Sequence, residues 1–258
     1  METDPTGTEK QEETIKEGGD ESLESPNPAG TVRDRAGMFG FLGSLFNHRV
    51  DADFVRRLKG GGISSLLVDD RMESIQPDIR LGLDEMSDFI QAVDSKTNKE
   101  IEQELAVDWT RLFRGVSPEY GPPPPFEGLY VKGGTDSHEV LETVLSCYKA
   151  NGFSPDPAFQ NRPDYIGMEL DFLGLLSERE AEALEAGDMS KASEYLKTVR
   201  SFLLEHLGKW CGDFCDRAVV HAKTDFYRGA LQVTKGIVSD EVAKAGQNRM
   251  GQADTANE

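Results

Sequence analysis

The 258-residue chain has few of the features that mark secreted, membrane-spanning or disulfide-stabilised proteins. Three cysteines, Cys147, Cys211 and Cys215, are too few for a disulfide framework in a chain this long, which favours a reducing compartment. No run of about 18 apolar residues occurs, so we expect no membrane insertion. The first residues lack a basic segment followed by an apolar run, so we expect no secretory signal. These absences predict a soluble cytoplasmic protein.

Basic residues are also scarce relative to acidic ones. The chain has 28 Lys and Arg against 47 Asp and Glu, for a formal net charge of −19. Binding to nucleic acid requires a basic surface that displaces counterions from phosphates, so we expect no nucleic-acid partner. The acidic balance suits a basic partner, although a solvated acidic surface is the simpler interpretation for most of these charges.

Hydrophobic periodicity predicts an all-α fold. Residues 1–32 are rich in Glu, Gly, Pro, Ser and Thr and poor in aromatics, so we expect a disordered acidic tail. From Met38 onward apolar residues recur at helical spacing, and neither an alternating strand pattern nor an internal repeat appears. We therefore predict one compact helical domain of about ten helices over residues 33–243, followed by a flexible tail over 244–258.

Local signals place most of these helices. Glycines at 37, 40 and 43 are typical of close helix packing rather than of a phosphate loop, because no strand precedes them. Helix start and stop residues predict helices over about 51–59, 77–93, 99–113, 136–152, 163–185, 189–207, 209–222 and 226–238.

The segment NRPDYIGMELDFL, residues 161–173, is the most informative. Pro163 fits the first position of a helix, and Asp164 then falls in the first turn, where the helix dipole favours a carboxylate. This reading places Asp164 and Tyr165 at the exposed mouth of a buried helix, where they would hold a basic group or a backbone donor. Taken alone, the segment is better explained as a capped core helix.

Two further features suggest a groove. Trp109, Leu112 and Phe113 share one helix face, which is typical of ordinary core but also of a surface that captures a peptide. The loop PEYGPPPPFEG, residues 118–128, follows them, and its four consecutive prolines must be extended. The run alone suits a ligand of a proline-binding module or a stiff spacer. We interpret it as a structural loop that packs over helices and shapes a groove.

Enzymatic signals are weak. The chain has four histidines, none in a recognisable motif, and no nucleophile elbow. Cys211 and Cys215, at i and i+4, would share a metal only if His206 or His221 folded back, so we expect buried structural cysteines, no metal and no cofactor. The alternatives to a binding protein are an all-helical metal-dependent enzyme that uses this Cys/His/carboxylate cluster, or an acidic protein-binding adaptor.

Several segments in order resemble the TorD/DmsD family of cytoplasmic chaperones that mature molybdoenzymes. LAVDWTRLFRG (105–115) is similar to a family helix that ends in an aromatic, Leu-Phe and Gly. YGPPPPFEGLYV (120–131) is similar to its proline-rich loop followed by Glu-Ser-Val-Tyr, and NRPDYIGMELDFL to its Pro-Asp-His and Glu-Leu-x-Phe-Met signature. His206, Leu207 and Trp210 match its His-Leu-x-x-Trp pattern. The resemblance covers about residues 36–240, with Tyr165 where many members have His.

The resemblance implies a chaperone that is not an enzyme and that binds the twin-arginine leader peptide and the apo form of a molybdopterin oxidoreductase catalytic subunit. It would assist cofactor insertion before export, as a monomer or a domain-swapped dimer. An apolar groove rimmed by carboxylates would suit such a leader. The expected peptide-binding residues are Trp109, Leu112, Phe113, Pro124, Phe126, Glu127, Asp164, Tyr165 and Glu169.

Overall fold

Helices supply the regular structure of the protein in a computed structural model, which describes residues 27–61, 76–115, 121–131, 137–154 and 162–254. No strand occurs within these ranges, and an isolated antiparallel bridge pairs Phe126 with Tyr165. The predicted all-α fold is therefore confirmed. The helices are α1 (Pro28–Asn47), α2 (Ala52–Lys59), α4 (Pro77–Ala92), α5 (Asn98–Phe113), α6 (Glu127–Tyr130), α7 (Ser137–Ala150), α8 (Ile166–Glu185), α9 (Met189–Glu205), the 3₁₀ turn η2 (Leu207–Lys209), α10 (Cys211–Val219) and α11 (Asp225–Asp254).

Both ends of the helical region extend beyond the predicted boundaries. Helix α1 begins at Pro28 rather than near residue 33, because the Asn27 side chain accepts a hydrogen bond from Gly30 N and Pro28 occupies the first helical position. Helix α11 continues to Asp254, through most of the segment expected to be a flexible tail. The predicted disorder of residues 1–26 lies outside the described residues.

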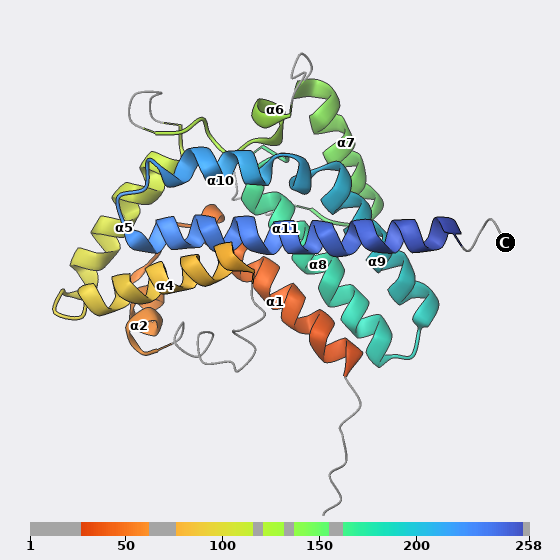
Figure 1. Cartoon of the computed structure of the whole chain (residues 1–258), viewed down its shortest axis with the longest axis horizontal. Helices are drawn as coiled ribbons and strands as arrows, with labels where there is room; N and C mark the ends of the chain where they lie inside the picture. Colours follow the sequence, from red (N-terminus) through yellow and green to blue (C-terminus); the bar gives the residue numbers. More distant parts are fainter. Residues whose placement is uncertain (1–26, 62–75, 116–120, 132–136, 155–161, 255–258) are drawn as a thin grey trace, which may run out of the picture.

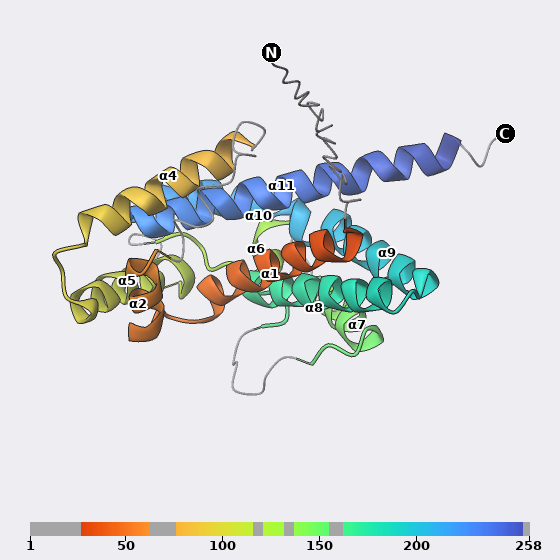
Figure 2. The same ribbon diagram turned by 90° about the horizontal axis from the view of Figure 1, so that it is seen from below.

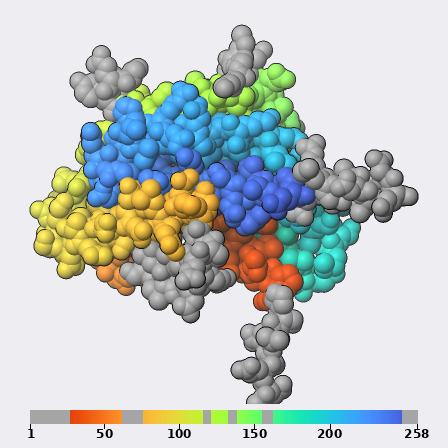
Figure 3. Space-filling model, in the orientation of Figure 1, coloured from red at the N-terminus to blue at the C-terminus, as the bar shows by residue number. Residues whose placement is uncertain are grey.

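The helices pack as antiparallel and crossing pairs around one core (Figure 1). Helix α1 lies along α8, and α9 also packs against α8. The long helix α11 runs beside α4, and both lie at the front of the face seen in Figure 3. Turned by 90°, the α4–α11 pair lies on one side and the α1–α8 pair on the other (Figure 2). Most residues of α8 are therefore buried, and they form a large part of the core.

The close contact of α1 with α8 explains the glycine at position 43. A Cβ added at Gly43 would lie 2.2 Å from Asp171 Oδ1 and 3.2 Å from the Gly167 carbonyl oxygen. The backbone of Gly40 lies against Gly174, at 3.3 Å from a Cβ built there. The predicted close packing is confirmed at Gly43, and the backbone of Gly40 approaches α8 at Gly174, whereas a Cβ added at Gly37 or at Gly40 itself would meet nothing within 4 Å.

A buried carboxylate joins α5 to the start of α11. Asp108 is 1% exposed and accepts hydrogen bonds from the backbone N–H groups of Lys223 and Thr224, at 2.9 and 2.8 Å. Its other oxygen accepts from Arg111 at 3.0 Å. The carboxylate thus satisfies the backbone donors of the two residues that immediately precede α11.

Within the described residues, none of the helices is both long and apolar enough to cross a bilayer.

Candidate functional site

The Pro-Asp segment forms a turn before α8 rather than the first turn of the helix. Helix α8 begins at Ile166, three residues later than predicted, with Pro163 and Asp164 in a turn and Tyr165 as the N-cap residue. Tertiary contacts hold the turn: Glu127 N donates to the Asp164 carbonyl oxygen at 2.8 Å, and Ile166 N donates to the Pro125 carbonyl oxygen at 3.0 Å. The sequence argument missed this because the partners lie some 40 residues away.

Asp164 is buried rather than exposed at a helix mouth. Its side chain is fully inaccessible and receives two hydrogen bonds of 2.9 Å from the Arg162 guanidinium. It also accepts from Gly128 N at 3.1 Å, in the first turn of α6. A carboxylate with these three donors is a cap for α6 and a clamp on the proline loop. The expectation of an exposed carboxylate at this position is wrong.

The aromatic residues expected to line a groove lie in the core. Trp109, Leu112, Phe113 and Tyr165 are each at most 3% exposed. Trp109 Nε1 donates to the Leu45 carbonyl oxygen at 3.1 Å, and the Tyr165 hydroxyl donates to the Phe46 carbonyl oxygen at 2.6 Å. These bonds satisfy carbonyls at the end of α1, so the aromatic face anchors α1 to α5 and α8.

The proline loop leaves part of its surface accessible. Pro124 and Phe126 are half-buried, and the Phe126 ring lies 4.9 Å from the Arg162 guanidinium carbon and 5.8 Å from the Tyr165 ring. The Tyr130 hydroxyl donates to the Pro123 carbonyl oxygen at 2.6 Å. The run at 122–125 forms neither helix nor strand, and residues 118–120 of the predicted loop lie outside the described residues.

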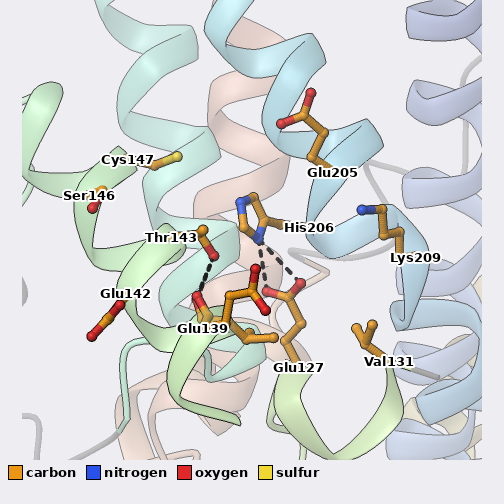
Figure 4. A pocket seen from close by; sticks show the side chains of 11 residues that line it. Glu127, Val131, Glu139, Glu142, Thr143, Ser146, Cys147, Glu205, His206 and Lys209 are labelled. Atoms are coloured by element: carbon orange, nitrogen blue, oxygen red, sulfur yellow. Dashed lines mark hydrogen bonds and ion pairs between the residues drawn. The ribbon is translucent and has the colours of Figure 1, made fainter. Parts of the chain in front are cut away.

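A large open cleft lies beside this loop, between α6, α7 and the end of α9 (Figure 4). Its volume is about 820 Å³. Helix α7 contributes one wall, and the chain from α9 into η2 contributes the opposite wall. The lining residues are Glu127, Val131, Glu139, Val140, Glu142, Thr143, Ser146, Cys147, Glu205, His206 and Lys209.

The floor of the cleft contains a buried carboxylate–imidazole pair. His206 Nδ1 lies 3.0 Å from Glu127 Oε2 and 3.2 Å from Oε1, and both side chains are largely inaccessible. Burial lowers the pKa of His206, but hydrogen bonds with Cys147 and Glu127, and the charge of Glu127, outweigh burial and raise it to about 9. His206 is therefore protonated at neutral pH, and its positive charge offsets that of Glu127.

A second carboxyl lies deeper, behind the pair. Glu169 is fully buried, and its Oε2 accepts a hydrogen bond from Trp210 Nε1 at 3.2 Å. Burial, reinforced by the nearby charge of Glu127, raises its pKa well above the ordinary value. Burial therefore favours the neutral form of this carboxyl.

The structure thus places only some of the nine expected peptide-binding residues at or beside the cleft. Glu127 lines the cleft, Pro124 and Phe126 are half-exposed beside it, and the other six are buried. The sequence argument missed the carboxylates of Glu139, Glu142 and Glu205. The His-Leu-x-x-Trp pattern does contain two residues of the site. Its His206 bonds Glu127, and its Trp210 bonds Glu169.

The Cys/His cluster considered for a metal is not assembled. Cys211 and Cys215 are buried with their sulfur atoms 4.0 Å apart, while His206 turns to Glu127. In the part of the chain that the structure describes, no three His, Cys, Asp or Glu side chains are grouped so as to hold a metal ion.

Comparison with protein families identifies the chain. The family model described as the nitrate reductase delta subunit matches residues 73–216, more than half of the chain. The protein therefore belongs to this family of TorD-type chaperones, which mature molybdoenzymes, and the predicted resemblance is confirmed. A comparison with curated proteins found no match.

Proposed function

Starting from membership of the nitrate reductase delta subunit family, we propose that the acidic cleft binds the basic leader peptide of a molybdoenzyme catalytic subunit before that subunit is exported. The observation that carries the proposal is the charge of the cleft. Three exposed carboxylates, Glu139, Glu142 and Glu205, face a space large enough for several peptide side chains.

These three carboxylates are available to a ligand. None of them forms an ion pair with a residue that the structure describes, whereas Glu127 is already balanced by His206. The cleft lining also includes one lysine, Lys209. A guanidinium offers paired N–H donors that match a carboxylate, so two adjacent arginines of a leader would find one acidic wall on α7 and another on α9.

The cleft also offers apolar surface. Val131 and Val140 line it and are half-buried, and Leu129 and Leu145 are exposed on the same two helices, α6 and α7. An apolar segment that follows the arginines of a leader would lie on this surface. The combination of charge and apolar area is more specific for such a leader than acidity alone.

The buried residues from the sequence prediction take a supporting role in this proposal. Asp164 fixes α6 and so positions Glu127, and Glu169 holds Trp210 beside it. Trp109, Leu112, Phe113 and Tyr165 are buried, and they anchor α1 to α5 and α8 instead of contacting the peptide. Pro124 and Phe126 border the cleft and would touch a bound peptide that extends along the proline loop.

Isothermal titration with a synthetic twin-arginine leader peptide tests the proposal. We expect the triple variant Glu139→Gln, Glu142→Gln, Glu205→Gln to bind at least about tenfold more weakly, since exposed ion pairs contribute up to about 1 kcal/mol each. A leader with Gln in place of both arginines should lose affinity for the wild type but not for the triple variant.

Glu194→Gln is the matched control, because Glu194 is an exposed carboxylate on the same helix as Glu205 but outside the cleft. It should bind the leader as the wild type does. Equal affinity of the triple variant and the wild type would show that the leader binds elsewhere.

A further inference from the structure

A second, smaller pocket lies where α1 ends and α2 begins. Its volume is about 350 Å³, and it is lined by Ser44, Leu45, His48, Arg49, Val50, Asp51, Phe54 and Arg57. The buried side chains of Leu45 and Val50 and the half-buried Phe54 give it an apolar floor. Polar groups surround this floor, so a small charged ligand would have its charged part at the rim.

The charge of this pocket is opposite to that of the rest of the molecule. Arg49 and Arg57 line it, and neither guanidinium forms an ion pair with a carboxylate that the structure describes. This is unusual in a chain with a net charge of −19, where neighbouring Arg56 bonds Asp53. The carboxylate in the pocket, Asp51, already accepts the Phe54 N–H at 2.7 Å as the cap of α2.

Arg49 is held in position by an aromatic ring. Its guanidinium carbon lies 5.7 Å from the centre of the Trp109 ring, and that of Arg114 lies 5.1 Å from the same ring. Trp109 is itself fixed by its bond to the Leu45 carbonyl oxygen. A guanidinium that rests on a fixed ring keeps its N–H edges free for a ligand and loses little entropy when it binds one.

We propose that this pocket is a binding site for a phosphate-class oxyanion, either free or carried by a small organic phosphate. Arg49 and Arg57 supply the charged N–H donors that such a group requires. The site lies at the junction of α1 and α2 and shares no lining residue with the acidic cleft, so it is separate from the proposed leader site.

Thermal unfolding and isothermal titration of the full-length protein with phosphate, pyrophosphate and ribose 5-phosphate test the site. We expect saturable binding and a raised unfolding midpoint, relative to sodium chloride at matched ionic strength. Arg57→Gln and Arg49→Gln should each weaken binding by about tenfold or more, the loss expected for a charged hydrogen bond. Tighter binding of ribose 5-phosphate than of phosphate would identify the organic phosphate as the ligand class.

Arg56→Gln is the matched control, since it removes the same charge one residue away on α2, outside the pocket. It should change affinity by less than about twofold. Arg57 is exposed and has no packing role, so Arg57→Gln remains informative even if Arg49→Gln disturbs the Trp109 contact. Equal stabilisation by chloride, or equal losses in Arg56→Gln and Arg57→Gln, would overturn the proposal.

Discussion

Glu127 and His206 are 79 residues apart in the chain and form a buried pair with 3.0 Å between Oε2 and Nδ1. The pair joins α6 to the end of α9 across the floor of the acidic cleft. It fixes one carboxylate of the cleft and leaves the others to a ligand. The pair therefore holds α6 against the end of α9 and also sets how much negative charge the cleft presents.

The Glu127–His206 pair should give stability a defined pH dependence. The folded-state pKa of His206, about 9, lies above its value of about 6.5 in an unfolded chain, so its contribution is complete below pH 6.5 and disappears as the pH rises through 9. In Glu127→Gln the pKa of His206 should fall, which NMR titration of the imidazole would measure. The free energy of unfolding lost in Glu127→Gln should shrink above pH 9. A His206 pKa that does not respond to Glu127→Gln would contradict the pairing.

Asp171, at the α1–α8 contact, should give stability a second pH dependence of the same sign, over a more acidic range. Burial raises its pKa to about 7, while the hydrogen bond from Asn47 Nδ2, at 2.7 Å, opposes the rise. The folded state then binds this proton more tightly than the unfolded state, so stability falls as the pH rises from about 4 to about 7. Asp171→Asn should remove this fall, as measured by urea unfolding across that range. Asp213→Asn, at an exposed carboxylate, is the control and should leave it in place.

The glycines of α1 should respond very differently to alanine. In Gly43→Ala the new Cβ meets Asp171 and the α8 backbone, so we expect a loss of about 1–3 kcal/mol from overpacking. In Gly37→Ala the Cβ enters open space, and helix propensity predicts a gain of up to about 1 kcal/mol. Denaturant unfolding of the two variants measures the difference. Equal effects would show that α1 does not pack on α8 through Gly43.

Asp164→Asn should destabilise the proline loop. The amide introduced at position 164 can still accept from Gly128 N. It loses the two charged hydrogen bonds with the Arg162 guanidinium, for an expected cost in stability of about 1–3 kcal/mol. An unchanged m-value in urea unfolding would show that the loss is in the native state. The matched exposed pair is Asp213 with Arg217, where Asp213→Asn should cost less than about 1 kcal/mol.

The three cysteines should differ in reactivity. Cys147 is half-buried in the wall of the cleft, whereas Cys211 and Cys215 are at most 2% exposed, and burial raises the pKa of Cys215 well above its usual value. Because thiolates are the reactive form, alkylation of the native protein should label Cys147 first. Mass spectrometry after brief iodoacetamide treatment checks this. A bound leader should slow the labelling, and equal labelling of all three thiols would contradict the described burial.

The sequence alone determined the helical fold, because helix periodicity and end signals are local. Helices α2, α4 and α5 begin and end within a residue of the predicted bounds, because Asp51, Gln76 and Thr97 cap their N-termini through bonds to neighbouring residues. The family followed from the order of its motifs. The start of α8 was misplaced, because the bonds that hold the Pro-Asp turn come from residues 125–128.

Only the tertiary structure decided which polar residues are accessible. Residues such as Asp164 and Glu169 are indistinguishable from surface acids in the sequence, yet both are buried, and Tyr165 with them. The acidic cleft combines short helix α6 with α7 and the end of α9, and no local pattern relates those three segments. Sequence periodicity identifies the face of a helix, but burial and charge pairing depend on which other helix covers that face.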